Sequence, residues 1–315
     1  MSAIGELRRM KDTGTGTAGT GVRQKKQNTV AYLFLLPWFI GLALITIGPM
    51  LASLGLAFTK YNLLSPPKFI GTRNLERMLE DERLHHSLSV TFQYVFISVP
   101  LQLAAALALA VLLDRGMRGL AFYRSAFYLP SLLGGSVAIA ILWRQLFGVD
   151  GLVNVVLAWF GIEGQGWISS PDTALGTLIL LNVWTFGAPM VIFLAGLRQI
   201  PSMYYEAAAV DGANRWQQFW RITLPMLTPI IFFNLVLQII HAFQSFTQAF
   251  IVSGGSGGPV DSTLFYTLYL YQRGFANLDM GYASAMAWLL LLIIAAFTAI
   301  NFWASKYWVF YDDED

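Results

Sequence analysis

Long intervals without Asp, Glu, Lys or Arg alternate with short charged segments along this chain. A charge at the centre of a membrane-spanning helix costs about 2.5–3.5 kcal/mol, so such intervals mark candidate spans. Six intervals qualify: 27–59, 87–113, 125–143, 173–197, 222–260 and 280–305. Even the shortest, about 19 residues, gives a helix of roughly 28 Å against a hydrocarbon core of about 30 Å. The pattern predicts an all-α integral membrane protein with six transmembrane helices.

The composition agrees with lipid as the main solvent of the chain. Hydrophobic residues make up 56% of the 315 residues and charged residues only 12%, against roughly 25% charged in soluble domains. The net charge of +2 is small and its basic residues are scattered, which does not indicate a nucleic-acid surface. The absence of cysteine excludes disulfides and thiol catalysis. We therefore predict a multi-pass protein that contacts a lipid bilayer and binds no nucleic acid.

The positions of Lys and Arg predict the orientation. With both termini in the cytoplasm, the inner segments carry 13 of the 20 Lys and Arg residues, and five of the other seven lie in the loop 60–86. Acidic residues accompany those five, so we expect one small folded loop there. Residues 1–28 are polar and are predicted to form a disordered cytoplasmic arm, residues 29–310 the membrane domain, and residues 311–315 an acidic cytoplasmic tail. No Gly-Lys-Ser/Thr follows the glycines of the arm, so ATP is expected to bind another chain.

The segment 201–225, between the fourth and fifth spans, predicts two short helices with a break. Ser202 is placed to cap the first helix, and Gly212 ends it because a left-handed terminal residue is cheap only for glycine. Asn214, with Gln217 three residues later, has the spacing of a capping box that begins the second helix. The result is a helix–turn–helix elbow on the cytoplasmic face.

The apolar and aromatic side chains of this elbow exceed what a solvated loop needs. They are Met203, Tyr204, Tyr205, Trp216, Phe219 and Trp220. The residues alone leave two interpretations open, which are burial in the membrane interface and docking into a groove on a partner protein.

The elbow resembles the cytoplasmic signature of permease subunits of bacterial ABC importers, which reads Glu-Ala-Ala, three residues, Gly, nine residues, Ile-x-Leu-Pro. The matching residues are Glu206, Ala207, Ala208, Gly212, Ile222, Leu224 and Pro225, with Asp211 inside the match. Further segments resemble carbohydrate permeases of the group that serves maltose, other oligosaccharides and glycerol-3-phosphate. They are Leu35-Leu-Pro37 to Tyr61-Asn62, Phe69-Ile-Gly71 with Asn74, Phe243-Gln-Ser-Phe246, Gly254-Gly255 with Pro259, and Asp279 to Ala285.

This resemblance implies a type I ABC importer permease bundle in the bacterial plasma (inner) membrane. It implies a second permease subunit, two ABC ATPase subunits that dock on the elbow and carry ATP and Mg²⁺, and a periplasmic or lipid-anchored solute-binding protein that delivers a sugar. The chain itself then has no cofactor, no metal site and no catalytic residue. It is similar to the larger permease of the maltose system, without the two extra N-terminal spans and the large periplasmic domain. Replacement of Glu206 or Gly212 is expected to abolish transport-coupled ATP hydrolysis and to leave membrane insertion intact.

Polar residues of the fifth predicted span share one helical face, which predicts a wall of the solute pathway. They are Asn234, Gln238, His241, Ser245 and Gln248, with Phe243 and Phe246 beside them. Amides can bond sugar hydroxyls and aromatic rings can cover C–H surfaces, but the same stripe could instead only join neighbouring helices. The stripe contains no Arg or Lys, which favours a neutral polyol over a phosphorylated solute unless the partner permease supplies the charge.

Two weaker stripes leave the same alternatives open. One comprises Thr91, Tyr94, Ser98 and Gln102 in the second span, and the other comprises Asn182, Thr185 and Pro189 in the fourth. Pro189 is expected to kink its helix and to free a carbonyl group.

Two other classes of protein share some of these features. A proton-coupled secondary sugar carrier would act alone, but it normally has an ionisable residue at mid-membrane and a detectable internal repeat, and we find neither. The six spans offer no Asp or Glu that could pair with His241. An intramembrane serine protease could use Ser256, but that serine is expected at the outer end of a span, away from a buried base. The importer permease is favoured, with the proton-coupled carrier as the alternative.

Overall fold

The computed structural model describes residues 34–114 and 119–310, and the chain divides into two compact units, residues 1–55 and 56–315. The predicted disordered arm 1–28 and the predicted acidic tail 311–315 lie outside the described residues. In the first unit the described residues belong to one apolar helix, Phe34–Ala57, which contains the π-helical segment η1 (Leu42–Ile47) and continues as α2 (Gly48–Ala57).

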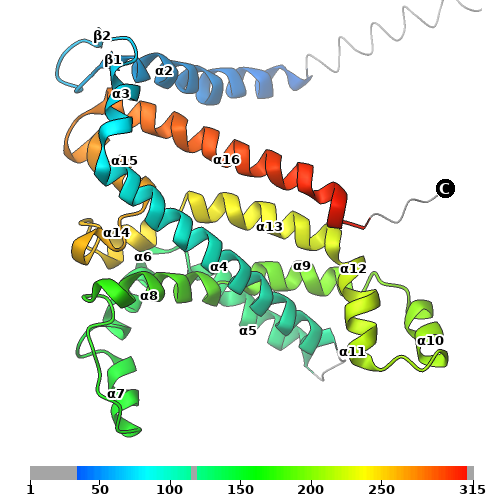
Figure 1. The fold of residues 1–315 in the computed structure, drawn as a ribbon. Coiled ribbons are helices and arrows are strands. Elements are labelled where there is room, and N and C mark those ends of the chain that lie inside the picture. Colours follow the sequence, from blue (N-terminus) through cyan, green and yellow to red (C-terminus); the bar gives the residue numbers. More distant parts are fainter. Residues whose placement is uncertain (1–33, 115–118, 311–315) are drawn as a thin grey trace, which may run out of the picture. The chain divides into compact units, whose positions relative to one another are not determined.

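Helices make up most of the second unit (Figure 1). A small antiparallel sheet pairs β1 (Thr59–Lys60) with β2 (Lys68–Phe69). The helices are α3 (Arg73–Glu80), α4 (Glu82–Asp114), α5 (Leu120–Leu133), α6 (Val137–Leu146), α7 (Leu152–Trp159), α8 (Pro171–Trp184), α9 (Gly187–Leu197), α10 (Ser202–Val210), α11 (Arg215–Gln218), η2 (Phe219–Thr223), α12 (Leu224–Met226), α13 (Thr228–Phe243), α14 (Thr247–Val252), η3 (Pro259–Asp261), α15 (Tyr266–Tyr271), η4 (Gln272–Ala276) and α16 (Met280–Trp308).

All six charge-free intervals lie largely in helices. By length and composition, four helices of the described residues can cross a membrane: Phe34–Ala57, Glu82–Asp114, Arg215–Val252 and Met280–Trp308. Two bent pairs, α5 with α6 and α8 with α9, bring the number to six if each pair forms one span. The predicted loop 60–86 is folded, as expected, into the small sheet and α3.

The third predicted span, 125–143, is not one straight helix. It divides into α5 and α6, whose axes differ by 96°. Two consecutive glycines, Gly134 and Gly135, weaken the helix at this point, and Ser136 begins a new one because its Oγ accepts a hydrogen bond from the Ile139 N–H at 3.3 Å. The prediction of one continuous helix was therefore wrong, since the charge-free interval does not record where the backbone breaks.

The fourth span bends by 41° between α8 and α9. Pro189 lies four residues after Thr185, so it has no N–H to donate to the Thr185 carbonyl, and its ring crowds that oxygen. The freed Thr185 oxygen accepts hydrogen bonds from Gln102 Nε2 at 3.3 Å and from Ser131 Oγ at 2.9 Å. The predicted kink and free carbonyl at Pro189 are confirmed.

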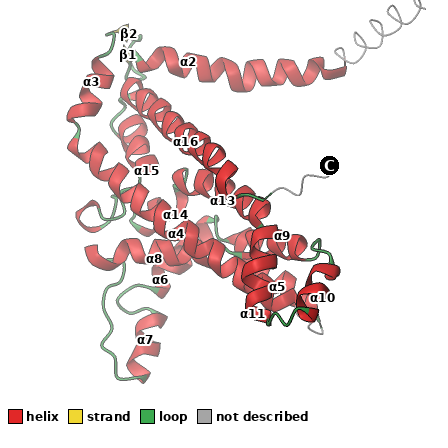
Figure 2. Cartoon of the chain, turned by 45° about the vertical axis from the view of Figure 1, so that its right-hand side comes forward, coloured by secondary structure: helices red, strands yellow, loops and turns green. Residues whose placement is uncertain are grey.

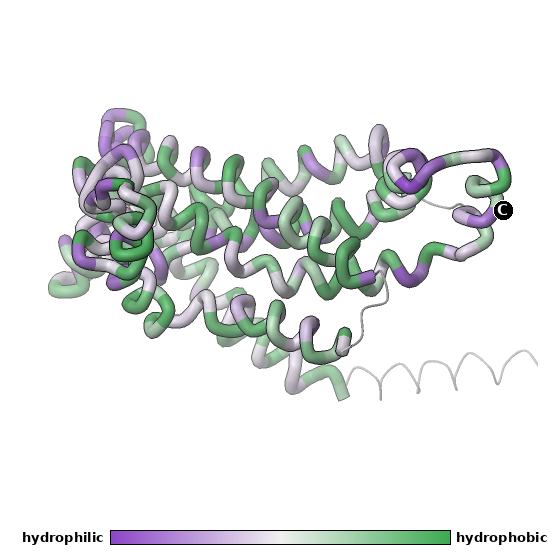
Figure 3. Tube along the Cα trace, turned by 90° about the horizontal axis from the view of Figure 1, so that it is seen from below, coloured by the Kyte–Doolittle hydropathy of each residue, from purple (hydrophilic) through white to green (hydrophobic). Residues whose placement is uncertain are grey.

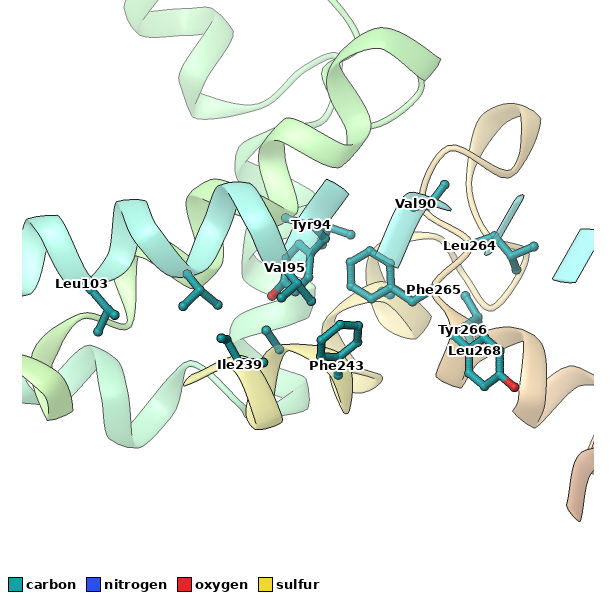
Figure 4. Close-up of a cluster of buried hydrophobic side chains, with 14 of the residues drawn as sticks. Val90, Tyr94, Val95, Leu103, Ile239, Phe243, Leu264, Phe265, Tyr266 and Leu268 are labelled. Atoms are coloured by element: carbon teal, nitrogen blue, oxygen red, sulfur yellow. The ribbon is translucent and has the colours of Figure 1, made fainter. Parts of the chain in front are cut away.

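Helix α4 packs against α8, α9 and α13 (Figures 1 and 2). The buried cluster in Figure 4 joins Tyr94 and Val95 of α4 to Ile239 and Phe243 of α13, and the Phe265 ring lies 4.5 Å from that of Tyr94. In lipid, contacts between such large side chains stabilise the helix bundle through van der Waals packing. This core holds the helices around the polar residues described below.

A charged cluster centred on Asp81 connects three segments at the end of the second unit where α3 lies. The Asp81 carboxylate accepts hydrogen bonds from the hydroxyls of Tyr269 at 2.7 Å and Tyr282 at 2.8 Å, from the Leu84 N–H at 3.1 Å, and from Arg273 Nη2 at 3.0 Å. Burial alone would raise the pKa of Asp81, but these hydrogen bonds and the Arg273 charge hold it below its ordinary value. Burial and the bond to Asp81 raise the pKa of Tyr269 to about 12.

Candidate functional site

The elbow has the predicted helix–turn–helix form, and local sequence rules account for most of it. Helix α10 ends at Val210, and Gly212 follows with a left-handed φ of +80°. The N–H of Gly212 then donates to the Ala209 carbonyl at 3.1 Å and the N–H of Ala213 donates to the Ala208 carbonyl at 2.9 Å, which is the Schellman arrangement. The termination of the first elbow helix by Gly212 is confirmed.

The second elbow helix begins with the predicted capping box. Asn214 Oδ1 accepts from the Gln217 N–H at 2.9 Å, and Gln217 Oε1 accepts from the Asn214 N–H at 2.8 Å. The prediction that Ser202 caps the first helix was wrong. Ser202 is the first helical residue and Pro201 precedes it with extended dihedral angles, so the serine hydroxyl makes no capping hydrogen bond.

The elbow presents the first part of its signature to solvent, including Glu206, Ala207 and Gly212. Glu206 and Asp211 are exposed, and neither forms an ion pair among the described residues. Apolar side chains beside them are also exposed, with fractions of 65% for Met203, 89% for Val210 and 69% for Trp216. In Figure 3 this region and the loops at the other end of the helices carry much of the hydrophilic sequence of the second unit. Arg215 and Arg221 of the elbow are exposed as well, so the elbow offers a surface of mixed charged and apolar character.

The elbow is joined directly to the fifth span. The helical run Arg215–Val252 contains the π-helical segment η2, which ends just before Pro225. Pro225 cannot donate a backbone hydrogen bond, and a π-helical turn at this place is typical of functional sites. The Tyr205 hydroxyl lies 2.9 Å from Thr223 Oγ1, so a hydrogen bond connects α10 to η2. Ile222 and Leu224 are half-buried at the base of the span.

Most of the predicted pathway residues meet in one cavity of about 350 Å³, which we call the central cavity. Its lining comprises Tyr94, Gln102, Ser131, Gly135, Asn182, Thr185, Ala188, Gln238, His241, Gln244, Ser245, Phe246, Thr247 and Gln248. No Asp, Glu, Lys or Arg occurs among the described residues of this lining. Amide, hydroxyl and imidazole groups therefore supply its polar character.

Asn234 was predicted with these residues but does not line the central cavity. Its side chain is 1% exposed, and its Nδ2 donates to the Ile230 carbonyl at 3.0 Å within the same helix. The expectation of one continuous helical face was also wrong. Helix α13 ends at Phe243, and Ser245 and Gln248 belong to a break and to the next helix, α14.

Hydrogen bonds between helices fix several of the cavity side chains. Gln102 Nε2 donates to Thr185 Oγ1 at 2.9 Å, and Asn182 Nδ2 donates to Gln102 Oε1 at 3.4 Å. Gln248 Nε2 donates to the carbonyl of Gly134 at 3.2 Å, where the third span is bent. The breaks of the third and fourth spans thus provide backbone carbonyls that orient the side-chain amides of Gln102 and Gln248. Among the described residues, the side chains of Gln238, His241 and Gln244 form no hydrogen bond across the cavity.

The polar stripes missed five lining residues: Ser131, Gly135, Ala188, Gln244 and Thr247. Ser131 and Gly135 flank the bend of the third span, and the sequence signal for them was the run Pro130-Ser-Leu-Leu-Gly-Gly-Ser136. Gln244 and Thr247 become cavity residues because the fifth span breaks between them. Thr91 and Ser98 of the weaker stripe do not line the cavity, and the Thr91 hydroxyl instead accepts from the Tyr266 N–H at 2.8 Å.

A helical membrane bundle with a polar cavity and an exposed elbow defines a transport permease. Residues 87–307 match the family described as "Binding-protein-dependent transport system inner membrane component", so the chain belongs to this family. It is a permease subunit of an importer located in the inner membrane and is not an enzyme, because ATP hydrolysis in such transporters occurs on separate ATPase subunits.

Relatives and solved structures extend this assignment. The chain is 54% identical over 293 residues to the probable ABC transporter permease protein YesP of Bacillus subtilis, covering 92% of this chain and 95% of YesP. It is 32% identical to the lactose transport system permease protein LacF of Rhizobium radiobacter, covering 87% and 93%. A crystal structure of a bacterial ABC transporter for alginate import has a TM-score of 0.77 at 22% identity, covering 90% of this chain and 97% of that one. The fold is therefore that of a type I ABC importer permease.

Proposed function

We propose that this chain forms half of the translocation pathway of an ATP-driven importer for a sugar or oligosaccharide. The observation that carries the proposal is the central cavity, whose lining offers amides, hydroxyls and one imidazole without any carboxylate or cationic side chain. Such groups can exchange hydrogen bonds with sugar hydroxyls, which offsets the cost of removing those hydroxyls from water. Relatives named as permeases for lactose and for trehalose/maltose support a carbohydrate solute.

We propose the following assembly. A second permease subunit completes the pathway, two ABC ATPase subunits bind ATP and Mg²⁺ and dock on the elbow, and a periplasmic or lipid-anchored solute-binding protein delivers the sugar. This chain then binds no cofactor and no metal. The exposed Glu206 and the apolar side chains around it support docking of a protein partner at the elbow. Docking of cytoplasmic ATPases requires that both termini of this chain face the cytoplasm.

The proposed coupling runs from the elbow into the fifth span. A displacement of α10 by the ATPases reaches η2 through the Tyr205–Thr223 hydrogen bond and through the covalent chain at Gly212. Helix α13 follows η2 and carries Gln238 and His241, so a tilt of this helix moves one wall of the central cavity. Alternating access would follow from this motion against the corresponding wall of the second permease.

Reconstitution of the complete transporter tests the proposal. Proteoliposomes that contain both permeases and the ATPases are expected to accumulate an oligosaccharide only with ATP and the solute-binding protein. Uptake that is driven by a pH gradient and continues without ATPase subunits would favour the proton-coupled carrier. In the part of the chain that the structure describes, the central cavity contains no carboxylate that could pair with His241. Ser256 lines a different cavity from His241, so no serine–histidine pair supports the protease alternative.

Variants on α13 separate pathway residues from packing residues. Gln238→Leu removes an amide from the central cavity and is expected to lower kcat/KM for uptake about fivefold, the effect of losing one hydrogen bond of about 1 kcal/mol. Asn234→Leu is the matched control, because Asn234 lies one turn earlier, is buried, and its Oδ1 has no hydrogen-bond partner among the described residues. We expect this control to change uptake by less than about twofold. Equal losses in both variants would contradict the assignment of the cavity as the pathway.

A further inference from the structure

A second cavity, of about 480 Å³, lies between the end of α6 and the glycine-rich turn after α14; we call it the outer cavity. Its lining comprises Arg144, Gly148, Ile168, Ser169, Val252, Ser253, Ser256, Gly258, Pro259 and Thr263. Among the described residues of this lining, Arg144 is the only charged one. The volume is in the range of small-ligand sites, which is about 300–1,000 Å³.

The outer cavity adjoins the central cavity along α14. Gln248 lines the central cavity and Val252 lines the outer one. These two residues are four positions apart, so their side chains lie on the same face of the helix, about 6 Å apart along its axis. In the orientation proposed above, the outer cavity is therefore on the extracellular side, one helical turn before the central cavity.

The guanidinium group of Arg144 is available to a ligand. Each of the four ion pairs among the described residues uses another arginine: Arg77, Arg83, Arg198 or Arg273. Nη1 of Arg144 lies beside the glycine-rich turn, 3.9 Å from the place where a Cβ atom on Gly254 would stand. A planar guanidinium presents five N–H donors in a geometry that matches a carboxylate.

The hydroxyls of the outer cavity complement this cation. Ser253, Ser256 and Thr263 donate their protons to backbone carbonyls at 2.6, 2.7 and 2.8 Å, respectively. Ser253 Oγ and Ser256 Oγ each also accept one backbone hydrogen bond, from the N–H groups of Gly257 and Gly258 at 3.2 Å, and keep one further lone pair. The cavity thus combines one cationic donor group with neutral acceptors, and its described lining contains no carboxylate to repel an anion.

We propose that the outer cavity binds one acidic sugar unit of the incoming oligosaccharide, with the carboxylate paired to Arg144 and the sugar hydroxyls donating to the serine and threonine oxygens. A single guanidinium matches the single negative charge of a uronic acid carboxylate. The transported solute is then an oligosaccharide that contains uronic acid units, and Arg144 selects it at the entrance. This inference rests on the proposed importer function and adds the class of its substrate.

Uptake of a matched pair of solutes by the complete transporter tests the inference. The pair is digalacturonate and its neutral dimethyl ester, and the variants are Arg144→Gln and Arg144→Lys. We expect Arg144→Gln to lower kcat/KM for digalacturonate about tenfold or more, because a hydrogen-bonded ion pair is lost. The kcat/KM for the ester is expected to change by less than about twofold. Arg144→Lys keeps the charge but loses the planar fork, so an intermediate loss for digalacturonate is expected.

Arg73→Gln is the control for general electrostatic attraction, because Arg73 is an exposed arginine of the loop 60–86 that forms no ion pair among the described residues. We expect this control to leave the ratio of the two solutes unchanged. An equal loss for both solutes in Arg144→Gln would assign Arg144 to docking or folding and would overturn the inference. The inference would also be overturned if the wild-type transporter took up the ester or another neutral oligosaccharide but no digalacturonate. The importer proposal would stand in that case. Absence of ATP-dependent uptake of every solute would overturn both.

Discussion

Gly212→Val is expected to abolish solute-stimulated ATP hydrolysis and uptake by the assembled transporter. Gly212 adopts a φ of +80°, and this left-handed conformation costs a residue with a Cβ atom about 1–2 kcal/mol, more when the side chain is β-branched. Valine would therefore open the turn that fixes α10 relative to α11. Because the turn sets the position of Glu206, the docking surface that we propose for the ATPases would be lost. ATP hydrolysis with and without the loaded solute-binding protein measures the coupling.

The same variant is expected to insert and fold normally. A Cβ atom on Gly212 would meet no atom within 4 Å, so no packing contact is disturbed. Gly161→Val is the matched control, because Gly161 has a φ of +73° and equally open surroundings but lies in the loop after α7. Gly212→Asn should retain part of the coupling, since asparagine tolerates the left-handed region. Normal coupling in Gly212→Val, or an equal loss in Gly161→Val, would contradict a docking role for the elbow.

The elbow shows what local sequence rules can predict. The end of the first helix at Gly212 and the capping box of Asn214 and Gln217 depend on residues within a few positions of each other, and both were predicted correctly. The positions of the spans were also predicted, because the cost of a charge in lipid acts on each segment by itself. The N-cap of the first elbow helix was predicted wrongly. Both Pro201 and Ser202 suit the start of a helix, and the structure places Pro201 at the N-cap and Ser202 inside the helix.

The central cavity shows what the sequence alone could not predict. The polar stripe of the fifth span indicated Gln238 and His241, but the chain breaks after Phe243 and then continues as α14. Gln248 reaches the cavity only because it bonds to Gly134 at the bend of another span. The helical periodicity of one segment cannot reveal this contact, because the contact joins residues that are more than one hundred positions apart. Asn234 fits the period but faces its own helix and the core.

The largest effect on stability is expected at Asp81, whose hydrogen-bond partners no local sequence pattern brings together. Tyr269, Arg273 and Tyr282 all donate to its carboxylate from segments close to two hundred residues away. Asp81→Asn removes the charge and leaves the guanidinium and one hydroxyl without their acceptor. Because the side chain of Asp81 is only 11% exposed and that of Arg273 29% exposed, we expect a loss of about 2–3 kcal/mol in the free energy of unfolding.

Thermal unfolding of the purified transporter in detergent measures this loss, with an expected decrease in Tm of about 5 °C. Asp279→Asn is the control, because its ion pair with Arg77 involves an arginine side chain that is 46% exposed, and such pairs contribute about 1 kcal/mol or less.

The pKa of Asp81 is lower in the folded protein than its ordinary value of 3.8, so its stabilising contribution is present above about pH 4 and is lost as the pH falls through the folded pKa. The difference in Tm between wild type and Asp81→Asn should therefore stay constant at neutral pH and narrow below about pH 4. Equal destabilisation by the two variants, or a difference that widens in acid, would show that the cluster is not held by the Asp81 charge.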